Sequence, residues 1–360
     1  MKHLKEKVGR LVHKSKEIIS DSALENGAIV AGNSDKAYYP KAAKDYHYVW
    51  PRQAAFICAA AQLVGIDTIQ EPFFGWLTER PEDFKKEGKL FNSYTVNGRI
   101  RLRQFEPDQA GTVLWAIHQF YQKTPSHARR QEALIRRLAD GLADDWQEKY
   151  FFTNTVDLWG ESKRQTSTLV ENNHTYSLAA CAHGLRRADA MLKNDRWKRA
   201  ADQMALRLND AYRPKQKMFV RNHGQIDDPN VDASLLGLTF PFTVVEPTDE
   251  RMRRTVERIE ATLVANGGVH RYQFDYYDGE GSAQEGGGAW PLLNCWLAIY
   301  WVLAGDTTKA MRAYQWVVER VGDDELIPEQ VFQDSRQGVK PLAWSHAMFI
   351  FASYHLGLLP

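Results

Sequence analysis

The segment 290–301 reads Trp-Pro-Leu-Leu-Asn-Cys-Trp-Leu-Ala-Ile-Tyr-Trp and is apolar around nearly its whole helical circumference. A helix that is apolar on every face has to be buried on every face. Comparable apolar segments begin near residues 51, 108, 174, 231 and 345, so they recur every 55–66 residues along the chain. A regular period of this length is typical of a repeat architecture.

Amphipathic, charged segments mostly alternate with the apolar ones, as in Arg-Arg-Gln-Glu-Ala-Leu-Ile-Arg-Arg at 129–137. Hydrophobic period and end signals predict helices in eleven places. They are residues 4–21, 51–65, 107–122, 128–149, 174–192, 194–212, 230–239, 249–265, 289–304, 306–321 and 344–358. The strand-like pieces are short, such as 217–221 and 269–273.

Six buried helices wrapped by amphipathic ones indicate an inner ring inside an outer ring, which is an all-α (α/α)6 barrel. An open helical solenoid is the alternative. A solenoid leaves one face of each helix pair in water, so it does not need six helices that are apolar all round. We therefore predict the barrel.

Composition is that of an ordinary globular protein, with 44% hydrophobic and 25% charged residues in 360. No Gly/Ser/Pro-rich linker divides the chain, so we expect one catalytic-type (α/α)6 domain over residues 1–360, with 1–30 as a helical lead-in. The formal net charge of +1 argues against nucleic acid or an anionic membrane as a partner. The sequence assigns no oligomeric state.

The N-terminal residues carry mixed charges, without the apolar run of a signal peptide or a membrane span. Cys58, Cys181 and Cys295 each lie in an apolar helical context. Their odd number and wide spacing favour small core residues over a disulfide framework or a metal site. A cytoplasmic location fits this cysteine usage.

Polar and aromatic side chains are concentrated in the segments that precede the apolar helices. These segments are 45–53, 103–109, 157–161 and 271–277, together with Glu329 and Trp344. A ring of parallel inner helices would bring them to one end of the barrel. Aromatic platforms beside charged groups suit the binding of sugar rings.

Cleavage of a glycosidic bond needs two carboxyl groups that flank it. Glu329, between Pro328 and Gln330, is the first candidate, and Glu161 is the second. Alternatively, Glu329 is a solvated glutamate of a loop, and Glu161 is an acid of a surface loop, since the segment 162–167 that follows it is plainly polar. Asp157 could equally cap a turn.

Arg52 lies in the first turn of an apolar helix, and a charge that faces a core has to be paired. A structural ion pair with Asp45 or Asp275 is the alternative to a binding role. Arg271 and Asp275 are four residues apart and could form a surface salt bridge.

Tryptophans either bind the sugar or pack the core. We expect Trp50, Trp159 and Trp344 to contact a sugar, whereas Trp115 and Trp290 are expected to be packing residues.

Metal and nucleotide chemistry find little support, so we expect no cofactor and no metal. The eleven histidines form no His-Glu-x-x-His motif, and the run Gly-Gly-Gly at 286–288 lacks the Lys-Ser/Thr of a phosphate loop. No Gly-x-Ser-x-Gly elbow is present.

Five motifs in combination resemble glycoside hydrolase family 15, the glucoamylase family, in its bacterial and archaeal form. They are Tyr-Val-Trp-Pro-Arg at 48–52, Asp-Leu-Trp at 157–159, Gly-Val-His-Arg-Tyr at 268–272, Gly-Gly-Ala-Trp-Pro-Leu-Leu at 287–293, and Leu-Ile-Pro-Glu-Gln-Val at 326–331 with Pro-Leu-Ala-Trp-Ser-His-Ala at 341–347.

The resemblance implies an (α/α)6 barrel and an inverting, exo-acting α-glucosidase. Glu329 takes the position of the general base. Trp50, Arg52, Arg271 and Asp275 take positions in the subsite for the non-reducing glucose.

Two residues depart from the family pattern. Gln53 stands where an Asp usually grips the hydroxyls of the terminal sugar, although an amide can also donate and accept hydrogen bonds. Gly160 stands where the first Glu of Leu-Trp-Glu-Glu is the general acid. Either Glu161 takes over this role or acid catalysis is lost.

The sequence therefore predicts an inverting exo-hydrolase of soluble α-gluco-oligosaccharides, without assigning the linkage. A catalytically weakened binding or regulatory relative is the alternative, because the family's relatives include a regulatory subunit of phosphorylase kinase. A helical scaffold for protein partners does not explain the polar and aromatic segments. A sugar phosphorylase is less consistent with a retained base.

Overall fold

The computed structural model describes residues 2–160, 166, 171–225, 228–275, 287–334 and 336–359. Helices dominate this part of the chain, which also contains four two-stranded antiparallel sheets. Among the described residues, no helix combines the length and the apolar character needed to cross a bilayer.

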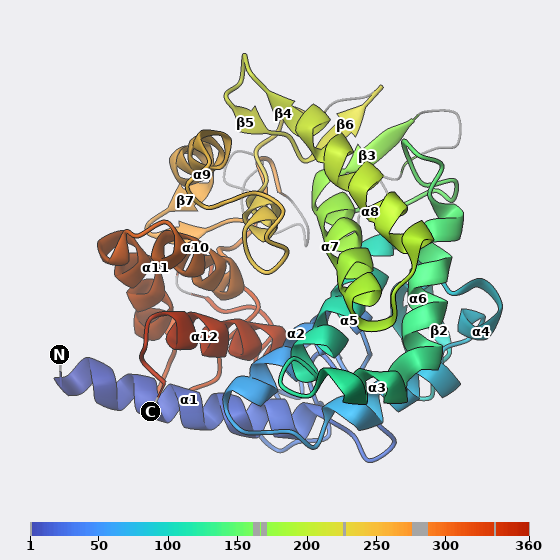
Figure 1. Cartoon of the computed structure of the whole chain (residues 1–360). Helices are drawn as coiled ribbons and strands as arrows, with labels where there is room; N and C mark the ends of the chain where they lie inside the picture. The colour runs from blue at the N-terminus through green and yellow to red at the C-terminus, as the bar shows by residue number, and fades with distance from the viewer. Residues whose placement is uncertain are drawn as a thin grey trace.

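An inner ring is formed by five α-helices and one 3₁₀ helix, each packed on the next, and the last returns to the first. In ring order they are α2 (Pro51–Leu63), α5 (Pro107–Phe120), α7 (Thr175–Leu192), η4 (Ala233–Leu238), α10 (Pro291–Leu303) and α12 (Ala343–His355). Figure 1 shows this arrangement, and the predicted starts near 51, 108, 174, 231, 290 and 345 are confirmed.

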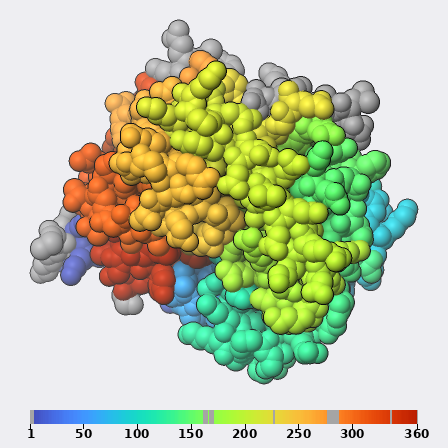
Figure 2. Space-filling model, turned by 45° about the horizontal axis from the view of Figure 1, so that its top comes forward, coloured from blue at the N-terminus to red at the C-terminus, as the bar shows by residue number. Residues whose placement is uncertain are grey.

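Six outer helices alternate with the inner ones along the chain (Figure 1). They are α1 (Lys2–Ser22), α3 (Gln70–Glu79), α6 (Glu132–Asp145), α8 (Asp195–Leu208), α9 (Glu250–Leu263) and α11 (Thr307–Arg320). Figure 2 shows successive parts of the chain following one another around the molecule. The fold is an (α/α)6 barrel, as predicted.

The helices of the two rings differ in their N-terminal residues and in the faces that they bury. α2, α5 and α10 each begin with a proline, whose fixed φ and missing N–H suit the first helical position. α9 instead has Asp249 as its N-cap, which accepts a hydrogen bond from the Arg251 backbone N–H. Its buried residues include Met252, Val256 and Ile259, a one-sided spacing expected for an outer helix.

The strands are short and connect the helices. They pair as β1 (Phe91–Tyr94) with β2 (Ile100–Phe105), β3 (Asn172–His174) with β6 (Asn222–Gly224), β4 (Tyr212–Arg213) with β5 (Met218–Phe219), and β7 (Val264–Ala265) with β8 (Gly268–Val269). The remaining elements are α4 (Phe84–Glu87), η1 (Pro125–Gln131) and η3 (Asn209–Ala211).

Among the helices of the two rings, η4 and α3 differ most from the prediction. The predicted helix over 230–239 is the short η4, which stops before Pro241, since the residue before a proline is driven away from the helical region. α3 was not predicted, because Pro72 and Gly75 interrupt its apolar pattern. Pro72 is tolerated because it lies in the first turn, where the backbone N–H has no partner within the helix.

Candidate active site

The N-terminal ends of the inner helices carry the candidate site. Arg52 near the start of α2 contacts Asp108 near the start of α5, and Asp108 accepts a hydrogen bond from Ser177 near the start of α7. The backbone N–H of Ala343, the first residue of α12, donates to the Ala31 carbonyl. Polar side chains from separate parts of the sequence therefore meet at one end of the barrel.

Glu329 lies in the loop before α12 and is only 7% exposed, so the alternative of a solvated surface acid is wrong. The Tyr46 hydroxyl donates to Glu329 Oε1 at 2.9 Å, and the Glu329 backbone N–H donates to the Val339 carbonyl. Burial raises the pKa of Glu329, whereas the hydrogen bond from Tyr46 and the charge of Arg271 act in the opposite direction. The result is a buried, oriented carboxyl group.

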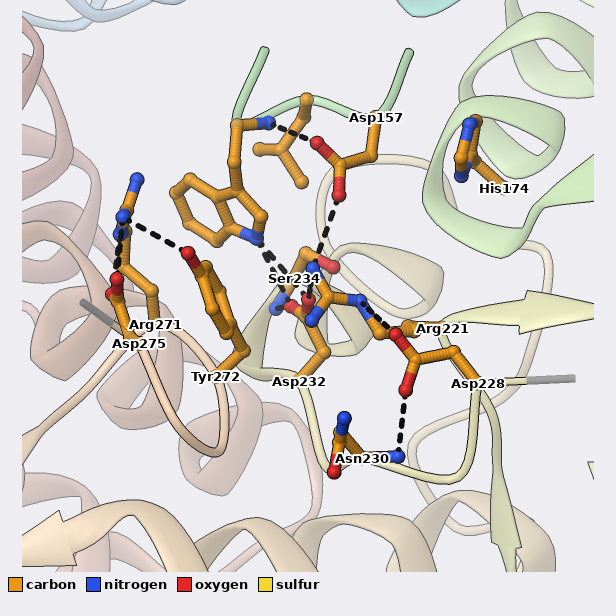
Figure 3. Close-up of polar contacts among 12 residues, drawn as sticks. Asp157, His174, Arg221, Asp228, Asn230, Asp232, Ser234, Arg271, Tyr272 and Asp275 are labelled. Atoms are coloured by element: carbon orange, nitrogen blue, oxygen red, sulfur yellow. Dashed lines mark hydrogen bonds and ion pairs between the residues drawn. The ribbon is translucent and has the colours of Figure 1, made fainter. Parts of the chain in front are cut away.

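Arg271 and Asp275 form a buried, two-point ion pair (Figure 3). Arg271 Nε lies 2.6 Å from Asp275 Oδ2, and Nη2 lies 2.7 Å from Oδ1. The alternative of a surface salt bridge is wrong. The guanidinium also lies over the rings of Trp159, Tyr272 and Trp290, each with its centroid 5.1 Å away.

A second buried arginine, Arg221, stands on the other side of Tyr272 in Figure 3. Its Nη2 contacts Asp157 Oδ2 at 3.0 Å and Asp232 Oδ2 at 2.9 Å. Asp232 also accepts from Trp159 Nε1 and from the Ser234 backbone N–H at the start of η4. This network fixes the Trp159 ring relative to the inner ring of helices.

Arg52 is 2% exposed and braces the loop that contains Gly160. Its Nη1 contacts Glu106 at 2.8 Å and Asp108 at 2.7 Å, while Nη2 donates to the Leu158 carbonyl. The alternative of an ion pair was right in kind, but the partners are Glu106 and Asp108. They replace the expected Asp45 and Asp275.

Glu106 is enclosed by hydrogen-bond donors. Besides Arg52, it accepts from Asn92 Nδ2 at 2.5 Å and from Gln109 Nε2 at 2.9 Å. Burial raises the pKa of Glu106 to about 8, and the neighbouring charge of Asp108 acts in the same direction. The carboxyl group is 0% exposed, so it is part of the support of the site.

Gly160 cannot carry a side chain without displacing this support. Its φ is +69°, and an added Cβ would lie 2.5 Å from Asn92 Nδ2 and 3.2 Å from Glu106 Oε1. A glutamate at this position would therefore meet both a strained backbone and two fixed side chains. Glu161, the candidate acid, lies outside the described residues.

Trp50 is half-buried, with its ring centroid 5.8 Å from that of Tyr46. Since Tyr46 contacts Glu329, Trp50 lies close to the catalytic candidate. The side-chain oxygen of Gln53 has no hydrogen-bond partner among the described residues.

Trp344 is 2% exposed and packs against Phe56 and Trp296. The Arg52 guanidinium lies 5.9 Å from its ring centroid. Trp344 therefore lies in the aromatic core beneath Arg52. Trp290, expected only to pack, contacts both Arg271 and Trp159.

Four functional candidates were missed by sequence reasoning: Tyr46, Glu106, Arg221 and Asp232. Tyr46 and Glu106 lie in the segments 45–53 and 103–109, which the sequence analysis identified as polar and aromatic. Their place near the site could therefore be predicted, but their hydrogen-bond partners could not. No signal in the sequence marks Arg221 or Asp232. In the described part of the chain, no three His, Cys, Asp or Glu side chains are grouped to hold a metal.

Comparison with known proteins gives the family. Residues 5–354 match the family model described as "Glycosyl hydrolases family 15". The chain belongs to this family.

Three proteins illustrate what the chain is similar to. An uncharacterized glycosyl hydrolase of Methanocaldococcus jannaschii is 29% identical over 337 residues, which cover 88% of this chain and 52% of that protein. The isomaltose glucohydrolase of Kribbella flavida is 26% identical over 350 residues, covering 87% and 86%. A glycosidase variant solved in complex with glucose superposes over the full length of both chains, with a TM-score of 0.81 and 25% identity.

The chain therefore spans about half the length of the Methanocaldococcus relative and most of the Kribbella relative.

Proposed function

We propose that this protein is an inverting, exo-acting glycoside hydrolase that releases glucose from the non-reducing end of soluble α-gluco-oligosaccharides. The observation that carries the proposal is the buried Glu329 carboxyl, oriented by Tyr46 beside the Arg271–Asp275 pair. Residues 1–360 act as a single catalytic-type domain, with 1–30 as its lead-in. Retention of this carboxyl favours catalysis over a binding or regulatory role.

Glu329 is the general base in this proposal. A base in an inverting enzyme removes a proton from the water that attacks the anomeric carbon. Its raised pKa makes the carboxylate a stronger proton acceptor than a solvated glutamate. The Tyr46 hydrogen bond holds Oε1, and a hydrogen bond from the Gln330 side chain also acts on the carboxyl group, so the group has a fixed orientation for the attacking water.

The glucose subsite is built from Arg271, Asp275 and the aromatic rings around them. Charged groups held by bidentate contacts keep a fixed orientation, which suits recognition of sugar hydroxyls. Trp50, Trp159 and Trp290 supply the apolar walls. Arg52 and Trp344 act from behind the subsite, and Gln53 presents an amide where the family usually has a carboxylate.

The general acid is assigned to Glu161. Gly160 leaves no room for a carboxyl at its own position, and Glu106 is the described carboxyl that adjoins it. Glu106 has a raised pKa, but its hydrogen bonds to Arg52, Asn92 and Gln109 direct it into the protein. Its role is to support the segment that ends at Gly160.

Glucose release from maltose, isomaltose and longer α-gluco-oligosaccharides tests this proposal. The wild type is compared with Glu329→Gln, Glu161→Gln and Glu106→Gln, and with Glu319→Gln as an exposed control. We expect activity in the wild type and the control, and loss by about 10²–10⁴-fold in Glu329→Gln and Glu161→Gln.

Full activity of Glu161→Gln would remove Glu161 from the mechanism. If Glu106→Gln loses activity but keeps its stability, Glu106 would instead be the general acid. No cleavage of any substrate by the wild type would contradict the proposed function.

A further inference from the structure

A cavity of about 290 Å³ lies at the end of the barrel opposite to Glu329. The ends of α5, α7 and α12 that lie farthest from the candidate site contribute to its walls, through residues such as His118, Arg187 and Tyr354. Arg187 is twelve residues from the start of α7, which corresponds to roughly 18 Å along the helix. The cavity is therefore separate from the site around Glu329.

Arg187 is the charged group of this cavity. It is half-buried, and its Nε donates to Nε2 of His183 at 3.1 Å. Among the described residues, neither of its terminal nitrogens has a hydrogen-bond or ion-pair partner. The adjacent Arg186, by contrast, is exposed and pairs with Asp202 at 3.2 Å.

His183 fixes the direction of the Arg187 guanidinium. The imidazole is 5% exposed, and burial together with the charge of Arg187 lowers its pKa to about 3. It is therefore neutral at ordinary pH, and its Nε2 accepts a hydrogen bond from the Arg187 Nε–H. The terminal nitrogens of the guanidinium remain available to another partner.

The charge of the cavity is not balanced by its own walls. No aspartate or glutamate is among the described residues that line it. His118 and His355 also line it, and burial lowers the pKa of both imidazoles, so Arg187 is the charged side chain among the described residues of this wall. Arg187 lies before the last turn of α7, so it is not explained by the carbonyls that favour a cation at a helix C-terminus.

Aromatic rings form much of the remaining wall. The Phe351 ring lies 6.1 Å from that of Trp115 and 5.2 Å from that of Phe240, measured between centroids. Tyr354 is 54% exposed at the rim. A volume of about 290 Å³ is at the small end of ligand sites, which corresponds to a single sugar ring rather than an oligosaccharide.

We propose that this cavity binds a monosaccharide-sized ligand that carries one oxyanion, either a phosphate or a carboxylate. The terminal nitrogens of Arg187 take the oxyanion in a bidentate contact. The aromatic wall packs against the apolar face of the ring. Because α5, α7 and α12 all begin at the end of the barrel that carries Glu329, the ligand bridges three helices that support the catalytic site.

Isothermal titration of the full chain with glucose 6-phosphate, gluconate, glucose and inorganic phosphate tests the proposal. We expect glucose 6-phosphate or gluconate to bind at least about tenfold more tightly than glucose or phosphate, and the tighter of the two identifies the oxyanion. Arg187→Gln should weaken that binding by about tenfold or more, whereas Arg186→Gln should leave it unchanged.

Tyr354→Ala is the second variant, because Tyr354 is exposed and its removal leaves the core intact. It should weaken binding of the anionic sugar and leave any weak binding of inorganic phosphate unaltered. Lack of binding by both anionic sugars, or binding that is insensitive to Arg187→Gln in a folded variant, would overturn the proposal. If inorganic phosphate binds as tightly as the anionic sugars, the proposal that the cavity recognises a sugar ring would be overturned.

Discussion

The arginines at the two ends of the barrel differ in their partners. At the candidate active site, Arg52, Arg221 and Arg271 are each buried and each contacts at least one carboxylate. At the opposite end, Arg187 contacts a neutral histidine, and no described carboxylate pairs with it. Pairing therefore separates arginines whose charge a carboxylate of the protein neutralises from one whose charge, in our proposal, a ligand neutralises.

This difference fits the chemistry expected at each end. Glycoside hydrolysis develops positive charge on the sugar ring, and carboxylates near the ring stabilise that charge. The candidate site accordingly keeps its arginines neutralised and adds Glu329 to them. A cavity with an unneutralised guanidinium would oppose such a transition state, but it would favour an oxyanion.

The largest effect is expected from Glu329→Gln, which keeps the shape of the side chain but removes the base. The turnover rate should fall by about 10²–10⁴-fold, with glucose release as the measurement. Arg187→Gln, at the other end of the barrel, should leave the rate with neutral oligosaccharides within about twofold. A large loss of turnover in Arg187→Gln, together with normal turnover in Glu329→Gln, would contradict the assignment of catalysis to the Glu329 end of the barrel.

Arg52→Met should lower the free energy of unfolding by about 3–5 kcal/mol, because it leaves Glu106 and Asp108 buried without their cation. Arg187→Met leaves no described carboxylate unpaired, but it removes the donor to the buried Nε2 of His183, so its cost should be smaller, about 1–3 kcal/mol. Urea unfolding of both variants measures the difference. Equal costs would show that charge pairing does not distinguish the two arginines.

Gly160→Ala should cost more than Gly65→Ala. Both glycines have a positive φ, +69° and +78°, which costs an alanine about 1–3 kcal/mol. Only at Gly160 would the new Cβ also meet Asn92 and Glu106, since Gly65 has nothing within 4 Å. Denaturant unfolding of the two variants measures the difference in free energy of unfolding that is due to the contact of the new Cβ with Asn92 and Glu106. An equal loss of stability in both variants would mean that Asn92 moves away without cost.

A smaller effect concerns pH. The Tyr46 hydrogen bond lowers the pKa of Glu329 against the effect of burial, so Tyr46→Phe should raise that pKa. The base works when it is ionised, and activity is lost as the pH falls through its pKa. The acidic limb of the pH profile of kcat/KM should therefore move to higher pH. Tyr48→Phe is the matched control, and an unchanged limb in Tyr46→Phe would contradict the assignment.

The barrel could be predicted because each inner helix is buried on every face and is therefore apolar all round, and because these apolar helices recur at a regular spacing. The sequence analysis missed the 3₁₀ form of η4, which is decided at Pro241, and it missed α3, whose apolar pattern is interrupted. At η4 the backbone constraint of Pro241 outweighs the hydrophobic period, whereas α3 forms although Pro72 and Gly75 interrupt that period.

The candidate site was only partly predictable. Glu329, Arg271 and Asp275 stand in short motifs, so their positions could be read from the sequence, and their roles remain predictions. The partners of Arg52 are 54 and 56 residues away, and Arg221 lies 64 residues from Asp157. No local spacing encodes such pairs, because the closing of the ring brings them together.

The anomeric form of the first glucose released is the most direct test of the account. Proton NMR follows the hydrolysis of maltose or isomaltose by the wild type during the first minutes, before mutarotation mixes the anomers. Attack by water activated at Glu329, on the face opposite the departing sugar, sets the anomer of the glucose from the non-reducing side, whereas the departing glucose keeps the α/β mixture of the substrate's reducing end. The account therefore predicts an early excess of β-glucose over its equilibrium share. An early excess of α-glucose would contradict inversion and, with it, the role of Glu329 as the general base.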